Sequence, residues 1–149
     1  LRQDRVDEAR ADVAAVVSLD AVRAGQFKLR LWQTAPDGKR SLAAQRRVAL
    51  QAGANRIQLP VRVEHPQRWF PTGYGAQALY RYQLEAGDAR TSTRTGLRSV
   101  QLRRDRDDKG SSFYFVVNGI PVFAKGANSI PFDMFQPRVT KAQLRRVLQ

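Results

Sequence analysis

The chain has 149 residues, of which 42% are hydrophobic and 26% are charged, a balance typical of a globular domain with one main core. Its 26 Lys and Arg residues exceed its 13 Asp and Glu residues, which gives a formal net charge of +13. The absence of cysteine excludes disulfides and thiolate sites, the single histidine excludes a histidine metal cluster, and no apolar run reaches the ~18 to 20 residues of a membrane helix.

Alternation of apolar and polar residues dominates the first hundred residues and predicts strands with one buried face. The alternating runs cover 13–19, 27–31, 45–50, 57–63, 78–86 and 97–103. Pro60 lies inside the fourth run and cannot donate to a ladder, so we expect an edge strand or a bulge there. Short strands separated by turns, without a helical period before residue 137, predict an all-β protein with an antiparallel, immunoglobulin-like β-sandwich.

The composition changes after the charged stretch 103–110, which we interpret as a boundary. Two apolar runs flank Asn118-Gly119, the strongest short signal for a type I′ turn, and predict a hairpin over 113–124. Thr140 and Gln143 form a capping-box pattern, which predicts a short C-terminal helix from about Lys141. Because the apolar face of that helix is only begun at Gln149, we expect the sequence to stop soon after the start of a second domain.

Three segments carry a family resemblance. The run FYFVVNGIPVFAKGAN at 113–128, continuing to Phe135 and Arg138-Val139-Thr140, resembles the segment that opens the catalytic barrel of β-mannosidases in glycoside hydrolase family 2. The run WFPTGYG at 69–75 resembles the turn before a late strand of that family's immunoglobulin-like domain. The run TGLRSV at 95–100 is similar to the strand that leads into the barrel.

The resemblance implies a retaining exo-β-mannosidase that removes terminal β-D-mannose. It implies an immunoglobulin-like β-sandwich domain over 1–110 and the truncated start of a (β/α)8 catalytic barrel over 111–149. The two catalytic Glu residues of such enzymes lie on later barrel strands, so we expect no catalytic residue here and no activity of this chain alone. Asn128 and Ser129 would fall at the C-terminal end of the first barrel strand and bind substrate. The structural alternative is that Asn128 and Asp133 cap a turn.

The expected partners are the remaining domains of the parent enzyme, a β-mannoside in the full-length protein, and a second copy bound through the barrel segment. Basic residues are scattered over nearly every strand, so we expect no nucleic acid; we also expect no membrane, cofactor or metal. The compartment stays open, and a periplasmic or secreted parent is compatible with the sequence. His65 is interpreted as a solvated loop residue.

Two alternatives remain. One is another member of the same superfamily, a β-galactosidase or β-glucuronidase, although the segment 126–130 departs from the Gly-Val-Asn-Arg-His of those enzymes. The other is an independent carbohydrate-binding or adhesion sandwich, which does not account for the hairpin and the capped helix. Trp69, Phe70 and Tyr74 form either a sugar-stacking platform or, as we favour, a packed turn, and Tyr80 and Tyr82 are expected in the core.

Overall fold

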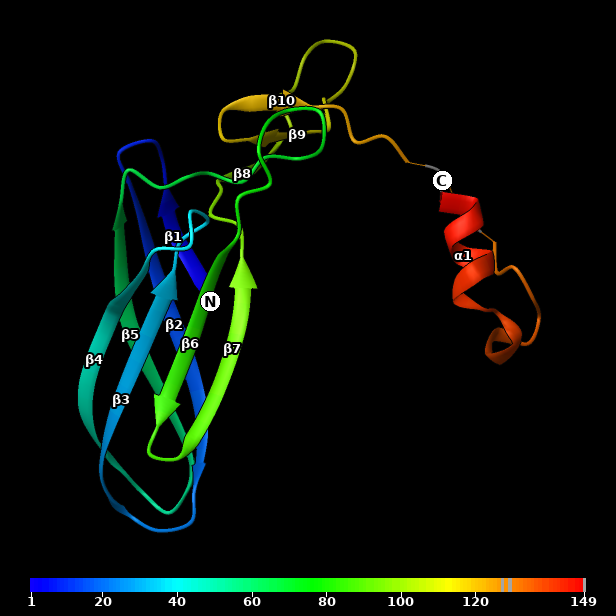
Figure 1. Ribbon diagram of the computed structural model, residues 1–149. Helices are drawn as coiled ribbons and strands as arrows, with labels where there is room; N and C mark the ends of the chain where they lie inside the picture. Colours follow the sequence, from blue (N-terminus) through cyan, green and yellow to red (C-terminus); the bar gives the residue numbers. More distant parts are fainter. Residues whose placement is uncertain (127, 129, 149) are drawn as a thin grey trace.

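The computed structural model describes residues 1–126, 128 and 130–148. Within these residues, strands dominate and one short α-helix lies near the C-terminus (Figure 1). The elements are β1 Arg2–Val6, β2 Arg10–Ala21, β3 Gly25–Thr34, β4 Arg40–Leu50, β5 Gly53–Glu64, β6 Tyr80–Ala86, β7 Ala89–Thr95, β8 Val100–Arg103, β9 Tyr114–Val117, β10 Ile120–Val122, the 3₁₀ turn η1 Gln136–Arg138 and the helix α1 Lys141–Leu148.

The first seven strands form a two-layer sandwich. One sheet has the order β1-β2-β5 and the other β4-β3-β6-β7, and all pairings are antiparallel. A third, smaller sheet of order β10-β9-β8 lies beyond one end of the sandwich (Figure 1). The predicted all-β, immunoglobulin-like sandwich with a following hairpin and short helix is thereby confirmed.

Alternation along the strands places one residue in two between the sheets. Leu29 and Leu31 of β3 are 0% and 3% exposed, and they belong to the same core cluster as Leu59 and Val61 of β5, at 1% and 4%. Burial of each such side chain contributes about 1.5–3 kcal/mol to folding. Tyr82, which is 1% exposed, joins this core as predicted, and its hydroxyl lies 2.8 Å from Gln33 Oε1, to which it donates.

The structure differs from the predicted strand list in three places. Strands β1 and β7 were not predicted, because the sequences RQDRV and ARTSTRT are polar on both faces, as edge strands allow. The predicted last strand at 97–103 is reduced to β8, which pairs with β9 instead of joining the sandwich. Pro60 lies on β5, whose ladder runs only to β2, so the predicted edge strand is confirmed.

The segments after β8 also follow local sequence signals. Asn118 and Gly119 have φ of 52° and 84°, and β10 pairs with β9 across them, so the predicted hairpin is confirmed. The helix α1 begins at Lys141, and its capping box forms because Thr140 N donates to Gln143 Oε1 at 2.8 Å and Gln143 N donates to Thr140 Oγ1 at 3.3 Å. None of the residues of α1 is buried, and no helix in the described part of the chain is long and apolar enough to cross a membrane.

Candidate functional site

A network of hydrogen bonds joins one end of the sandwich to the small sheet. We call it the junction and define it by Gln3, Trp69, Gly96, Arg98 and Asn118. These residues come from β1, from the turns beside β6 and β7, and from the hairpin, so they are far apart in sequence. The junction is therefore the place where the tertiary structure fixes the hairpin relative to the sandwich.

Gln3 ties β1 to the segment that follows β7. Its Nε2 donates to Gly96 O at 3.0 Å, and its Oε1 accepts from Arg98 N at 2.9 Å. The amide therefore satisfies an acceptor and a donor of a segment that has left the sheet ladder. Leu97, between these two backbone groups, is 0% exposed and anchors the same segment in the core.

Asn118 makes the matching link from the hairpin. Its Oδ1 accepts from Ser99 N at 3.0 Å, and its Nδ2 donates to Trp69 O at 2.9 Å. The backbone N–H of Asn118 also donates to Ser99 O at 3.0 Å. One side chain at the tip of the hairpin thus bonds both to Ser99, which precedes β8, and to Trp69 in the 69–75 turn.

Trp69 is half-buried and packs against the segment that follows β7. A Cβ atom on Gly96 would lie 2.4 Å from Trp69 Cγ, so the ring packs directly on the glycine backbone. The Arg98 guanidinium lies 4.9 Å from the ring centroid, within cation–π range. Tyr74, at the other end of the turn, accepts a hydrogen bond from Phe123 N at 3.2 Å. These contacts support the packed-turn interpretation over sugar stacking.

Of the two predicted substrate-binding residues, the structure describes one. Asn128 is exposed, and Ser129 lies outside the described residues. Asp133 accepts a hydrogen bond from Phe135 N at 2.7 Å, which is the turn-capping role that we gave as the structural alternative. A sugar-binding role of Asn128 and Ser129 stays a prediction.

Several carboxylates of the sandwich, among them Asp4, Asp7 and Asp12, form surface ion pairs. Asp4 lies 2.6 Å from Arg2 Nε, and this hydrogen bond lowers the pKa of the Asp4 carboxyl. The pKa of Asp7 is lowered first by the backbone N–H of Arg10 and then by the Arg5 side chain. Groups held in the ionised form do not donate protons near neutral pH. Among the described residues, no three His, Cys, Asp or Glu side chains gather into a metal-binding group.

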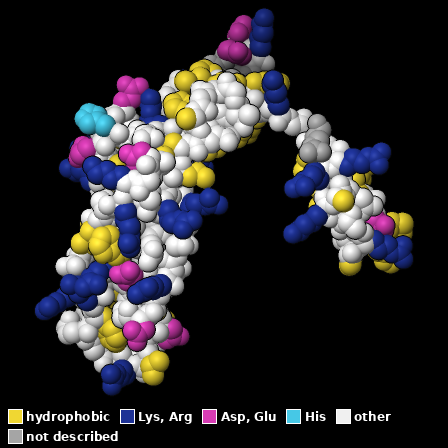
Figure 2. All heavy atoms as spheres, viewed as in Figure 1, with side chains coloured by type: hydrophobic (Ala, Val, Ile, Leu, Met, Phe, Trp, Pro, Cys, Tyr) yellow, Lys and Arg dark blue, Asp and Glu magenta, His cyan; other side chains and the backbone are white. Residues whose placement is uncertain are grey.

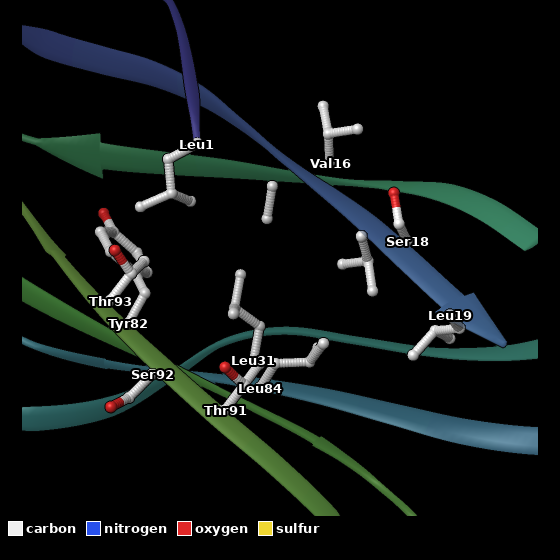
Figure 3. A pocket seen from close by; sticks show the side chains of 12 residues that line it. Leu1, Val16, Ser18, Leu19, Leu31, Tyr82, Leu84, Thr91, Ser92 and Thr93 are labelled. Carbon is white, nitrogen blue, oxygen red and sulfur yellow. The ribbon is translucent and has the colours of Figure 1, made fainter.

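A cavity of about 220 Å³ opens between the two sheets of the sandwich (Figure 3). It lies between β2 and β7, with Leu31, Tyr82 and Leu84 among its lining residues. It opens here because β1 pairs with β2 only as far as Arg2↔Ala14. Its only ionisable side chain is Tyr82, and burial raises the pKa of that phenol, so the cavity offers apolar contact and hydroxyl groups without an acid–base pair.

Sequence reasoning missed Gln3 and Asn118 as junction residues. The Asn118-Gly119 pair was interpreted only as a turn, although a turn asparagine also carries a donor and an acceptor. Gln3 lay in a segment with no predicted strand. Gln3 is a neutral amide among charged neighbours, and this local pattern does not indicate a hydrogen-bond partner such as Gly96, which lies 93 positions away.

Comparison with known proteins gives consistent relatives. Residues 1–98 match the protein family described as "Glycosyl hydrolases family 2". The beta-mannosidase of Bos taurus is 38% identical over 112 residues, which cover 68% of this chain and 13% of the bovine protein. The probable beta-mannosidase of Caenorhabditis elegans is 39% identical over 88 residues, which cover 55% of this chain and 10% of that protein. The chain thus spans a small part of the length of these relatives.

Two solved structures match nearly the whole chain. The beta-D-mannosidase of Dictyoglomus thermophilum has a TM-score of 0.81 and 31% identity, covering 99% of this chain and 18% of that one. A beta-glucuronidase of Bacteroides uniformis has a TM-score of 0.71 at 19% identity, covering 98% of this chain and 18% of that one, which shows the shared fold alone.

Proposed function

The chain belongs to the glycosyl hydrolases of family 2, and on this premise we propose that it is the non-catalytic sandwich domain of a retaining exo-β-mannosidase. The supporting observation is the similarity to the Dictyoglomus thermophilum beta-D-mannosidase, because it covers 99% of this chain, including the hairpin and the helix. The proposed substrate of the whole enzyme is a terminal β-D-mannose residue.

We also propose a domain boundary within the chain. Residues 1–110 form the sandwich domain, and residues 111–149 form the start of a (β/α)8 barrel whose other strands carry the catalytic pair. Retaining hydrolysis needs two carboxyl groups about 5–5.5 Å apart, one protonated and one ionised. The ion-paired sandwich carboxylates Asp4 and Asp7 do not meet the need for a protonated acid.

The role of the sandwich in this proposal is to position the barrel. A displacement of about 1 Å at a reacting centre can lower a rate by two orders of magnitude, so the angle at which the first barrel hairpin leaves the sandwich matters. Asn118 and Gln3 fix that angle through bonds to Trp69, Ser99, Gly96 and Arg98. The exposed apolar residues of the hairpin, Phe113 at 69% and Phe123 at 74%, would pack against the remaining barrel.

An assay with an aryl β-mannoside tests the proposal. The 149-residue chain and the product of the complete reading frame are compared, and the anomer of the released sugar is followed by NMR. We expect turnover with retained configuration only from the complete product. Turnover by the 149-residue chain would contradict the proposed absence of a catalytic pair. A complete product that cleaves only aryl β-glucuronides or β-galactosides would assign the chain to the alternative branch of the family.

A further inference from the structure

One outer face of the sandwich carries seven of the 26 Lys and Arg residues of the chain. The residues concerned point away from the core on the β4-β3-β6-β7 sheet, and we call this surface the cationic face. Its basic residues are Lys28, Arg30, Arg40, Arg47, Arg81, Arg90 and Arg94. Glu85 is the one acidic residue at the outward positions of these strands. The sheet lies in front in Figure 1, and Figure 2 shows basic side chains along its length.

In the described strands, five of these cations have no acidic cross-strand neighbour, and Glu85 lies directly opposite the other two, Arg30 and Arg90. Glu85 is already engaged, because its carboxylate accepts from Trp32 Nε1 at 3.0 Å and from Gln83 Nε2 at 3.4 Å. Within the described residues, none of the seven basic side chains of the cationic face forms an ion pair. The opposite sheet is arranged differently, since Asp12 pairs there with both Arg10 and Arg62, at 3.1 Å and 3.0 Å.

The register places like charges directly opposite each other twice. Lys28 of β3 is the cross-strand partner of Arg47 of β4, and Arg81 of β6 is the partner of Arg94 of β7. Directly opposed like charges destabilise a sheet. A feature that breaks a local stability rule without a structural gain is expected at functional positions. The arrangement therefore points to an anionic ligand that supplies the missing charge.

The composition of the face narrows the class of anion. A groove of about 340 Å³ on this face is lined by Gln26, Lys28, Arg30, Glu85 and Arg90, together with Phe27 and Gly87. Arg30 and Arg90 present the planar fork that binds carboxylate or sulfate in a bidentate manner. Glu85 and Gln26 offer acceptors for hydroxyl donors. A sugar chain with acidic groups provides both hydroxyl donors and anionic groups, whereas the backbone of a DNA duplex provides only the anionic groups.

We propose that the cationic face binds an acidic polysaccharide, a sugar chain that carries carboxylate or sulfate groups. The site is separate from the junction and needs no barrel, so it stands independently of the proposed hydrolase role. The groove holds one acidic sugar unit, and the flanking cations at Arg47, Arg81 and Arg94 contact the neighbouring units of the chain.

The test uses the 149-residue chain and heparin as the acidic polysaccharide, with binding followed by isothermal titration calorimetry over a series of salt concentrations. A neutral mannan and a DNA duplex of matched length are the comparison ligands. The face variant combines Lys28→Gln, Arg30→Gln and Arg90→Gln. The control variant loses the same charge elsewhere, through Arg23→Gln, Arg56→Gln and Arg104→Gln, which are exposed and lie off the cationic face. Circular dichroism checks that both variants keep the sandwich.

We expect heparin to bind and the neutral mannan not to bind, with weaker binding as salt rises. The face variant should bind heparin about tenfold more weakly, because three exposed ionic contacts are lost, while the control variant changes much less. Equal losses in the two variants would overturn the proposal, since binding would then follow net charge alone. No binding of heparin would also overturn it, as would a DNA duplex bound as tightly as heparin.

Discussion

Replacing Asn118 by glycine tests whether one side chain holds the hairpin on the sandwich. Glycine adopts the positive φ of 52° at this position without strain, so the type I′ turn is kept. The change removes the bond from Ser99 N to Oδ1 at 3.0 Å and the bond from Nδ2 to Trp69 O at 2.9 Å. It therefore isolates the junction contacts from the turn itself.

The magnitude follows from these two bonds. Each contributes about 1 kcal/mol net, so Asn118→Gly should weaken the docking of the hairpin by about 2 kcal/mol. Asn118→Ala removes the same bonds and adds about 1–2 kcal/mol of strain, because a residue with a Cβ atom resists the left-handed conformation. The hairpin should accordingly dock more weakly in Asn118→Ala than in Asn118→Gly.

Native-state hydrogen exchange measures the effect where it occurs. The Ser99 amide and the ladder amides of Phe115 and Val117 should lose protection by about 30-fold in Asn118→Gly, whereas Leu59 in the core should keep its protection. Asn55→Gly is the matched control, since within the described residues the Asn55 side chain bonds only to the turn around Gln51 and Gly53. Unchanged protection at Ser99 and Val117, or equal losses in the glycine and alanine variants, would refute the reasoning.

Three further outcomes are expected. Gly96→Ala should lower the urea unfolding free energy by about 1–3 kcal/mol, because the new Cβ meets Trp69 at 2.4 Å, while Gly25→Ala, with its nearest contact at 3.5 Å, should cost less. Burial raises the pKa of Tyr82 above its usual 10.0, so the stability that the neutral phenol contributes is complete below pH 10 and is lost as pH rises further. Tyr82→Phe should reduce this loss of stability at high pH in a pH series of thermal melts. The chain should self-associate in sedimentation experiments at rising concentration through its exposed hairpin, and Phe123→Ser, but not Val22→Ser, should weaken the association.

Local patterns in the sequence determined much of the secondary structure. The alternation in β3 and β5, the positive-φ pair at Asn118 and Gly119, and the Thr140–Gln143 cap each depend on neighbours within a few residues. The edge position of Pro60 followed from its missing N–H. Such signals are readable because their physical causes lie in the chain itself. The family resemblance over residues 66–149 added what local physics does not contain, namely a connection to β-mannosidases.

Tertiary structure alone decided the strand partners and the surfaces. β7 is polar on both faces and lies at a sheet edge, where Thr91, Ser92 and Thr93 line the open cavity. The sequence of β7 alone does not show that position. The scattered basic residues became one cationic face because outward positions of four strands meet in register, which no single strand reveals. Gln3 and Asn118 became junction residues only when the fold brought them to Gly96 and Trp69. Contacts between segments that are distant in sequence depend on packing, and a one-dimensional pattern does not specify that packing.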